Sequence, residues 1–255
     1  MLSETSKAPV GLAVCLDKVV VRYPLELNRP TSLKEYVIRQ MKRDIHRQYL
    51  TALKEISTEI PMRETFGVIG RNGAGKSTFL KVIARIIQPT SGRMQVWGKV
   101  VSLLGVGAGF HPELSGKENI FLYSALLGRS QSFTADHYGE IVEFSELDDF
   151  IDAPIRTYSS GMIARLGFAV AMVDRPDLLL VDEVLGVGDE FFREKCRLRF
   201  SEFHNAGTTL IIVSHSLGEI EKLCQRAMWL HEGVVKKVGR AVDVVNAYKS
   251  FKFDQ

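Results

Sequence analysis

The part of this sequence best suited to chemistry runs from Thr65 to Thr78, where a short apolar stretch leads through G-x-x-x-x-G-K-S into a helical pattern. This spacing is typical of a phosphate-binding P-loop, because its glycines let the backbone turn its N–H groups toward a polyphosphate. Lysine adds a point charge for the phosphates, serine offers a hydroxyl to Mg²⁺, and the following helix directs its positive dipole end at the anion. The loop residues predicted to bind nucleotide are Gly70, Asn72, Gly73, Ala74, Gly75, Lys76, Ser77 and Thr78.

Within this loop, Lys76 is also a predicted catalytic residue and Ser77 a predicted metal ligand. A P-loop alone is compatible with kinases, GTPases and transport ATPases. The remaining candidates must therefore decide between these classes.

A second apolar run, residues 178–183, ends in two carboxylates. An Asp at the carboxyl end of a parallel strand beside a P-loop can hold Mg²⁺, and an adjacent Glu can orient or deprotonate the attacking water. Asp182 is the predicted metal ligand and Glu183 the predicted catalytic base. His215 follows the apolar run 209–213 and is predicted to reach the γ-phosphate from the same sheet edge, with a structural histidine as the alternative.

Tyr23 closes a β-branched run near the start of the chain. Its ring could stack on a nucleotide base, since every base has a π-face, although a tyrosine of the core or surface fits the pattern equally well.

These candidate residues can meet only if their strands end at one edge of a sheet, with helices between the strands. The pattern of apolar runs predicts such an arrangement, a single α/β domain over residues 1–255. Residues 112–175 read as an inserted α-helical lobe. Residues 225–255 read as a hairpin through Glu232–Gly233 and a closing helix. Residues 79–87 are predicted to form the helix after the P-loop.

Residues 24–50 differ from the rest of the chain. Helical spacing from position 32 to about 49 predicts a basic amphipathic helix, which suits a membrane surface, a partner helix, an anionic headgroup or simply solvent. Its basic residues are Lys34, Arg39, Lys42, Arg43 and Arg47.

Composition excludes some classes. The 33 basic and 30 acidic residues give a net charge of only +3, which does not by itself indicate a nucleic-acid partner, and our first hypothesis includes none. The three cysteines lack C-x-x-C spacing, which fits a reducing cytosol and predicts neither disulfides nor zinc. No apolar run approaches the ~20 residues of a membrane span, and residues 10–16 read as a strand rather than a signal peptide.

Taken together and in order, the P-loop, the Ser-Ser-Gly-Met segment at 159–162, the run ending in Asp182–Glu183, and His215 resemble the nucleotide-binding subunit of an ABC transporter. The segments GFHPELSGKENI at 109–120, YSSGM at 158–162 and EVLGVGD at 183–189 are similar to those of polysaccharide and polyol-phosphate exporters, which serve O-antigen, capsule, galactan or teichoic acid.

The resemblance implies a P-loop NTPase core of ABC ATPase type, with an antiparallel β portion and the inserted helical lobe. Two copies would sandwich ATP and Mg²⁺, with Ser159, Ser160 and Gly161 of one copy facing the other's P-loop, and Asp189 at the interface. Tyr23 would stack on adenine. The homodimer would lie on the cytoplasmic face of the inner membrane and drive a lipid-linked glycan through a separate integral-membrane permease, with residues 24–50 near that permease.

Three positions depart from the common ABC pattern. The hinge at 104–110 contains no Gln, Ser160 and Met162 replace Gly and Gln of the signature, and residues 186–189 replace Ala-Leu-Asp. Two other functions remain possible: an ABC ATPase acting on nucleic acid or a protein assembly, and a regulatory nucleotide-binding protein with little turnover.

Overall fold

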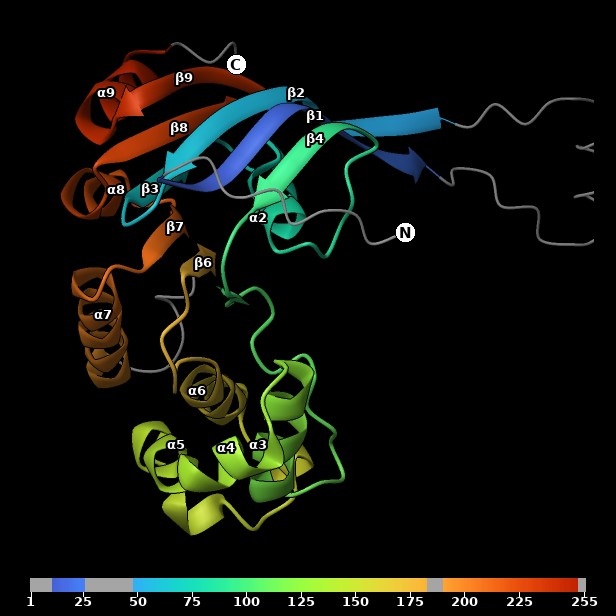
Figure 1. The fold of residues 1–255 in the computed structure, drawn as a ribbon, viewed down its shortest axis with the longest axis vertical. Coiled ribbons are helices and arrows are strands. Elements are labelled where there is room, and N and C mark those ends of the chain that lie inside the picture. Colours follow the sequence, from blue (N-terminus) through green and yellow to red (C-terminus); the bar gives the residue numbers. More distant parts are fainter. Residues whose placement is uncertain (1–10, 26–47, 183–189, 252–255) are drawn as a thin grey trace, which may run out of the picture.

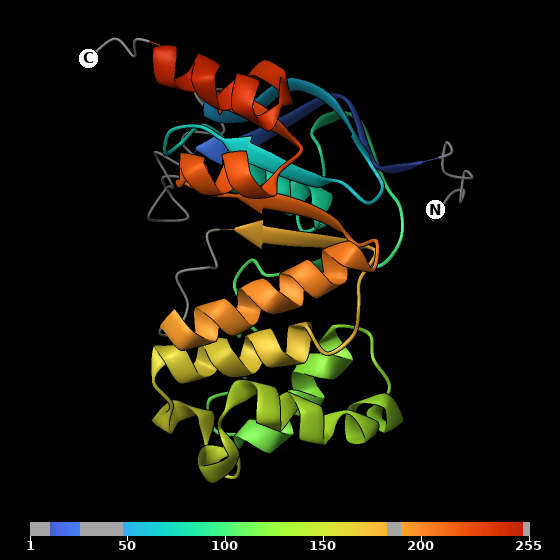
Figure 2. The same cartoon turned by 90° about the vertical axis from the view of Figure 1, so that its left-hand side faces the viewer.

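The computed structural model describes residues 11–25, 48–182 and 190–251. Figure 1 shows two parts, a core built on two sheets and a lobe of helices below it. Figure 2 shows the same division from the side. The α/β class, the antiparallel β portion and the helical lobe predicted from the sequence are all confirmed.

The central sheet has six strands in the order β5-β6-β7-β3-β8-β9. Neighbouring strands are parallel except for β8 and β9, which form an antiparallel hairpin. Its strands β3, β6 and β7 are buried along almost their whole length because both faces of the sheet are covered. The strands are β3 (Thr65–Ile69), β5 (Val100–Ser102), β6 (Leu178–Asp182), β7 (Thr209–Val213), β8 (Arg226–His231) and β9 (Val234–Arg240).

An antiparallel sheet of three strands covers one face of the central sheet. Its two long strands form a ribbon that extends beyond the core in Figure 1. The strands are β2 (Gln48–Pro61), β1 (Leu12–Leu25) and β4 (Ser91–Val96), paired in that order. Helix α2 (Lys76–Ile83) packs in the same layer, through Phe79 and Leu80.

The predicted insertion at 24–50 is shorter than expected at both ends. Pro24 pairs with Tyr49, and Tyr23 with Leu50, as antiparallel strand residues. The prediction of helix up to Tyr49 is therefore wrong at its end, because cross-strand pairing overrides a helical spacing of apolar residues. The rest of the predicted amphipathic helix lies outside the described residues.

The opposite face of the sheet is covered by helices. Residues 112–175 contain α3 (Gly116–Leu126), α4 (Gln131–Asp136), α5 (Tyr138–Ser145) and α6 (Ser160–Ala171). A capping box of Ser115 and Glu118 starts α3. The remaining helices are α7 (Glu190–Asn205), α8 (Leu217–Leu223) and α9 (Ala241–Ser250). Among the described residues, none of the helices combines the length and apolar character of a membrane span.

The helix after the P-loop also ends earlier than predicted. Helix α2 stops at Ile83 rather than at residue 87. Arg85 adopts a left-handed conformation (φ 60°), and its guanidinium donates to the carbonyl of Val96, 2.6 Å away. This contact with β4 follows directly after the helix end, and the local spacing of apolar residues does not predict it.

Candidate nucleotide-binding site

The P-loop lies between β3 and α2, as predicted. All five residues of β3 are buried, so the loop begins from a fixed point inside the core. Lys76 is 6% exposed, and its Nζ donates to the carbonyls of Gly70 (2.8 Å) and Arg71 (3.1 Å). Two backbone carbonyls of the loop thus contact the ammonium group, while Asn72 and Gly73 are exposed.

Asp182 and His215 reach the same edge of the sheet as this loop. Asp182 pairs with Val213 across β6 and β7, and Val213 pairs with Val68 across β7 and β3. Asp182 therefore lies about 10 Å, two strand spacings, from the P-loop strand. His215 is exposed two residues beyond the end of β7. Glu183 and Asp189 lie outside the described residues.

The turn that carries His215 is anchored on both sides. Ser214 Oγ donates to Glu219 Oε2 (2.9 Å) and accepts from the N–H of Ser216 (3.0 Å). A fixed turn of this kind can hold the imidazole at the sheet edge without ordering cost on ligand binding.

Tyr23 also belongs to this neighbourhood. Its hydroxyl lies 3.3 Å from Thr78 Oγ1 in the first turn of α2. The ring is half-buried against the apolar layer below β1, which leaves part of it open beside the P-loop helix. The structure therefore brings Tyr23 to the loop.

The signature segment does not meet the P-loop of its own chain. Ser159 caps α6 by accepting from the N–H of Met162 (3.2 Å), and α6 lies in the lobe, separated from α2 by the central sheet (Figure 1). Helix α6 begins on the side toward which β6 points (Figure 2). A pocket of about 560 Å³ opens beside its first turn. The pocket is lined by Glu146, Leu147, Phe150, Ser159, Gly161, Met162 and Arg165.

The hinge between core and lobe consists of two successive turns. The N–H of Ala108 donates to Gly105, and that of Phe110 donates to Gly107. Burial raises the pKa of the Tyr123 hydroxyl, partly offset by a hydrogen bond from the backbone of Gly107. Tyr123 on α3 thus contacts the backbone of the hinge at Gly107.

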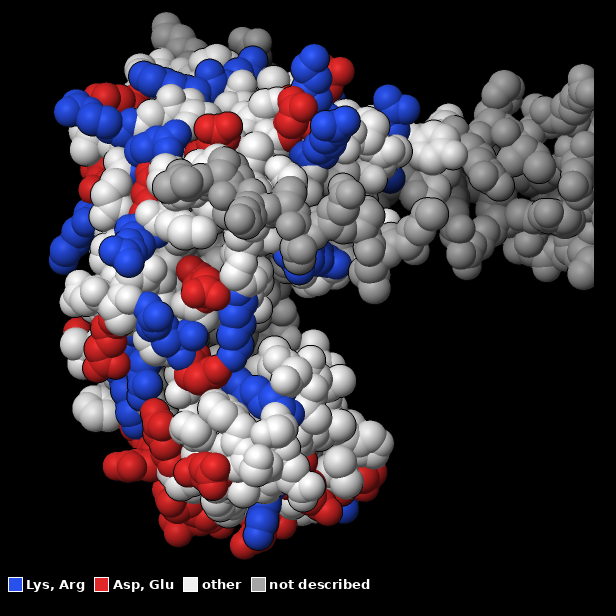
Figure 3. Space-filling model, in the orientation of Figure 1, with Lys and Arg blue, Asp and Glu red and all other residues white. Residues whose placement is uncertain are grey.

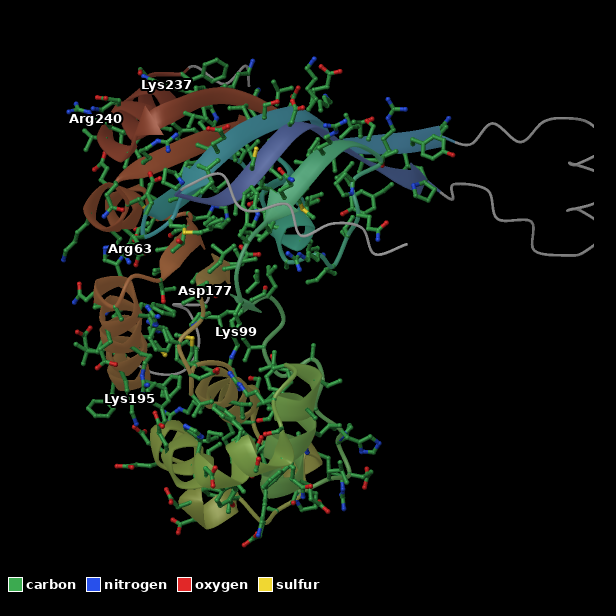
Figure 4. All side chains as sticks on the ribbon, viewed as in Figure 1. Arg63, Lys99, Asp177, Lys195, Lys237 and Arg240 are labelled. Carbon is green, nitrogen blue, oxygen red and sulfur yellow. The ribbon has the colours of Figure 1, made fainter. Side chains whose placement is uncertain are left out.

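An ion network joins lobe and core. The Lys99 N–H donates to Asp177 Oδ2 (2.7 Å), two residues that Figure 4 labels where the sheet meets the lobe. Asp174 pairs with both Lys99 and Arg129, and the Arg129 side chain is only 4% exposed. Burial alone would raise the pKa of Asp174, but these two cations lower it overall.

Charge is distributed unevenly over the surface. Figure 3 shows carboxylates gathered at the lobe end and basic side chains over the core. The exposed acidic residues of the lobe are Glu113, Glu118, Asp136, Glu140, Glu143, Glu146, Asp148, Asp149 and Asp152. This end of the molecule therefore carries a local excess of negative charge.

Comparison with known families and proteins decides the class. The family model described as "ABC transporter" matches residues 53–186, more than half of the chain. The chain belongs to the ABC transporter family. The α/β core, P-loop and helical lobe described above are thus those of an ABC ATP-binding subunit.

Within the ABC transporter family, several relatives match over most of the chain. The chain is 43% identical over 235 residues to the O-antigen export system ATP-binding protein RfbB of Klebsiella pneumoniae, covering 91% of this chain and 95% of that protein. It is 37% identical over 241 residues to the teichoic acids export ATP-binding protein TagH of Listeria innocua, covering 94% and 71% respectively. An RfbB of Myxococcus xanthus is 47% identical over 200 residues, covering 78% of this chain but only 46% of that longer protein.

Solved ABC structures share the fold. An ATP-binding subunit of an ABC transporter superposes with a TM-score of 0.71 at 18% identity, covering 93% of each chain. The ATP-binding cassette MJ0796, solved as a dimer bound to ADP and Pi, superposes with a TM-score of 0.70 at 20% identity, covering 89% of this chain and 98% of that one.

Two residues beside the P-loop have no role in the sequence analysis. Gly233 in the β8–β9 turn bonds to Ala74 of the loop, and Ala52 on β2 lies against both Gly75 and Gly233. The Glu-Gly dipeptide predicts the turn itself. No local pattern, however, indicates that this turn folds onto the P-loop.

Proposed function

We propose that this chain is the ATP-hydrolysing subunit that powers export of a lipid-linked polysaccharide, such as an O-antigen, galactan or teichoic acid, through a separate membrane permease. The observation that carries the proposal is the meeting of P-loop, Asp182 and His215 at one sheet edge. The near full-length similarity to the Klebsiella RfbB supports polysaccharide as the class of cargo.

Hydrolysis in this site depends on positioning and charge neutralisation rather than on covalent chemistry. Lys76 exchanges the carbonyls of Gly70 and Arg71 for phosphate oxygens, and the N-terminus of α2 adds its dipole. Glu183, next to Asp182, orients the attacking water, and His215 contacts the γ-phosphate. Tyr23 stacks on adenine while its hydroxyl stays near Thr78.

Ser77 and Asp182 suit Mg²⁺. This ion prefers oxygen ligands and usually takes only one or two side chains, with waters and phosphate oxygens completing its shell. The described residues contain no group of three or more His, Cys, Asp or Glu side chains that could hold a metal alone. Bound Mg²⁺ would neutralise charge that develops on the phosphates.

The active unit is a homodimer. A signature segment that is exposed in the lobe and separated from its own P-loop can act on nucleotide only from a second copy. The pocket beside Ser159 and Gly161 opens next to this contact. ATP favours the closed pair and hydrolysis releases it, and this difference in binding moves the permease.

The protein acts as a peripheral subunit at the cytoplasmic face of the membrane. The β1–β2 ribbon ends at Leu25 and Gln48, on either side of the basic segment 26–47. A basic segment next to such a ribbon is suited to the junction with permease and lipid headgroups.

The proposal is tested by steady-state ATP hydrolysis of the wild-type chain and Glu183→Gln, with oligomeric state measured in ATP and Mg²⁺. We expect Glu183→Gln to lower hydrolysis by about 10²- to 10⁴-fold and to accumulate as a dimer. Glu202→Gln, an exposed carboxylate toward the far end of α7, serves as control and should behave as wild type. Wild-type-like hydrolysis by Glu183→Gln would overturn the assigned chemistry.

The cargo is tested separately. Purified with its membrane partner, the chain should hydrolyse ATP faster when a lipid-linked glycan is present in the vesicle. Absence of any polytopic partner, together with salt-dependent binding of DNA or RNA, would instead identify an ABC ATPase acting on nucleic acid.

A further inference from the structure

The turn between β8 and β9 has an unusual position for a hairpin end. Glu232 and Gly233 both have positive φ (49° and 77°) between the paired residues His231 and Val234, as in a type I′ turn. Turns of this kind are commonly exposed. Here Gly233 is buried, because the turn lies against the P-loop on one side and β2 on the other.

The backbone N–H and the carbonyl of Gly233 both form hydrogen bonds with residues outside the hairpin. Its N–H donates to the carbonyl of Ala74 in the P-loop at 3.0 Å. Its carbonyl accepts from the N–H of Lys54 on β2 at 2.7 Å. One residue of the turn thus links the loop that binds phosphate to a strand of the projecting ribbon.

Close packing makes this link rigid. A Cβ added at Gly233 would lie 2.7 Å from the carbonyl oxygen of Ala52. A Cβ added at Gly75, the last P-loop glycine, would lie 2.7 Å from the same oxygen. The carbonyl of Ala52 is therefore held between the two glycines, and real Cβ contacts of this length do not occur with backbone atoms.

We propose that Gly233, together with Ala52 and Lys54 of β2, positions the P-loop for nucleotide. The inference rests on the nucleotide-binding role proposed above. A phosphate cradle needs its N–H groups at fixed points, and Asn72 and Gly73 at the exposed rim are too far into solvent to be held by packing. We call Gly233, Ala52 and Lys54 the clamp. The clamp contacts the P-loop at Ala74 and Gly75, where the loop enters α2.

The ribbon of β1 and β2 also contacts the nucleotide site at a second point, apart from the clamp. Strand β1, the partner of β2, carries Tyr23, whose hydroxyl is 3.3 Å from Thr78. Movement of the ribbon therefore shifts Tyr23, the proposed contact for the base, and the P-loop together. By linkage, a partner that shifts the ribbon changes nucleotide affinity, and nucleotide changes the partner's affinity by the same factor.

The first test compares Gly233→Ala with Gly128→Ala. Gly128 has nearly the same φ, +80°, but nothing lies within 4 Å of an added Cβ there. Both variants therefore carry the backbone strain of Ala at positive φ, and only Gly233→Ala adds the collision with Ala52. The measured quantities are the Kd for MgADP and for an ATP analogue, and the Tm without nucleotide.

We expect Gly233→Ala to weaken nucleotide binding at least about tenfold, while Gly128→Ala binds as wild type, because small displacements of a binding cradle are costly. A folded Gly233→Ala chain that binds nucleotide as tightly as Gly128→Ala overturns the inference. In that case the proposed function stands, because the wild-type chain still binds. Failure of the wild-type chain to bind any nucleotide overturns both.

A second measurement needs no variant. Amide hydrogen exchange of the wild-type chain is followed with and without MgADP. If the clamp and the loop form one unit, nucleotide slows exchange at the N–H groups of Gly233 and Lys54, and changes that of Val238, farther along β9, much less. Unchanged exchange at Gly233 and Lys54, with nucleotide bound, contradicts the clamp.

Discussion

At the scale of single residues, Lys76 is bonded to the loop that it serves. Its ammonium group donates to the carbonyls of Gly70 and Arg71 in that loop. These two bonds hold the side chain beside the backbone of the P-loop, which lowers the cost of ordering it.

Replacing Lys76 with Met should lower ATP hydrolysis at least about 100-fold, because the phosphates lose a fixed positive charge. The variant should remain folded, as measured by circular dichroism. Lys81→Met, at an exposed lysine later on α2, is the matched control and should hydrolyse ATP normally. Hydrolysis by Lys76→Met within a few-fold of wild type would contradict the assigned role.

Tyr23 has two separable features, a ring and a hydroxyl next to Thr78. Tyr23→Phe keeps the ring, and Tyr23→Ala removes both. If the ring stacks on adenine, Tyr23→Phe should bind ATP nearly as wild type and Tyr23→Ala should lose about 1–3 kcal/mol. Isothermal titration with ATP and with inorganic triphosphate checks this, since only ATP affinity should respond to the ring.

Equal losses for ATP and triphosphate would show instead that Tyr23 acts on the phosphate loop. Tyr49→Ala, an exposed aromatic on the same ribbon, controls for general damage to β1 and β2.

At the scale of elements, the lobe is joined to the core by the network of Lys99, Asp174 and Arg129. The buried guanidinium of Arg129 also donates to the carbonyls of Val170 and Ala171 at the end of α6. The loop before α4 thus holds the far end of the signature helix. Loss of Asp174 would leave a buried cation without its carboxylate.

Asp174→Asn should destabilise the chain by about 1–3 kcal/mol near neutral pH. Because the pKa of Asp174 is lowered from 3.8 in the folded state, its contribution is present above that value and is lost as pH falls through the folded pKa. The difference in urea unfolding free energy between wild type and variant should therefore shrink toward zero in strong acid.

Asp136→Asn, at an exposed carboxylate of α4, provides the comparison. A stability difference for Asp174→Asn that stays constant down to the lowest pH measured would mean that the carboxylate does not titrate as described.

At the scale of the whole molecule, the proposed homodimer accounts for the separation of the signature segment from the P-loop. The signature segment and the P-loop lie in different parts, yet α6 begins on the side toward which the sheet strands point. Two copies related by a twofold axis can place each signature against the other's P-loop.

Complementation between two inactive chains tests this arrangement. Lys76→Met lacks a working P-loop, and Gly161→Asp lacks a working signature. A Cβ added at Gly161 would lie no closer than 3.8 Å to any other atom of its own chain, so this variant should fold normally. A mixed dimer contains one intact composite site. Mixing equal amounts should therefore restore about a quarter of wild-type hydrolysis, as expected for random pairing in a twofold dimer. Activity no higher than that of either variant alone would argue against shared sites.

Those parts of the site that consist of short, continuous stretches of sequence were largely predictable. The P-loop, the buried strand ending in Asp182, and the strand before His215 each occupy a short stretch, so type and spacing indicate both element and role. The hairpin at Glu232–Gly233 was predictable for the same reason, because positive φ at two turn positions selects such dipeptides.

The sequence by itself thus determined the class of fold, the phosphate-binding motif and the order of strand, loop and helix around that motif. Only the tertiary structure decided that Gly233 bonds to Ala74, that Ala52 lies between two glycines, and that Tyr23 reaches Thr78. It also decided where the ribbon continues as strand rather than helix, at Tyr49 and Leu50. These contacts join residues far apart in the chain through backbone groups, which carry no residue-type signature and follow no period.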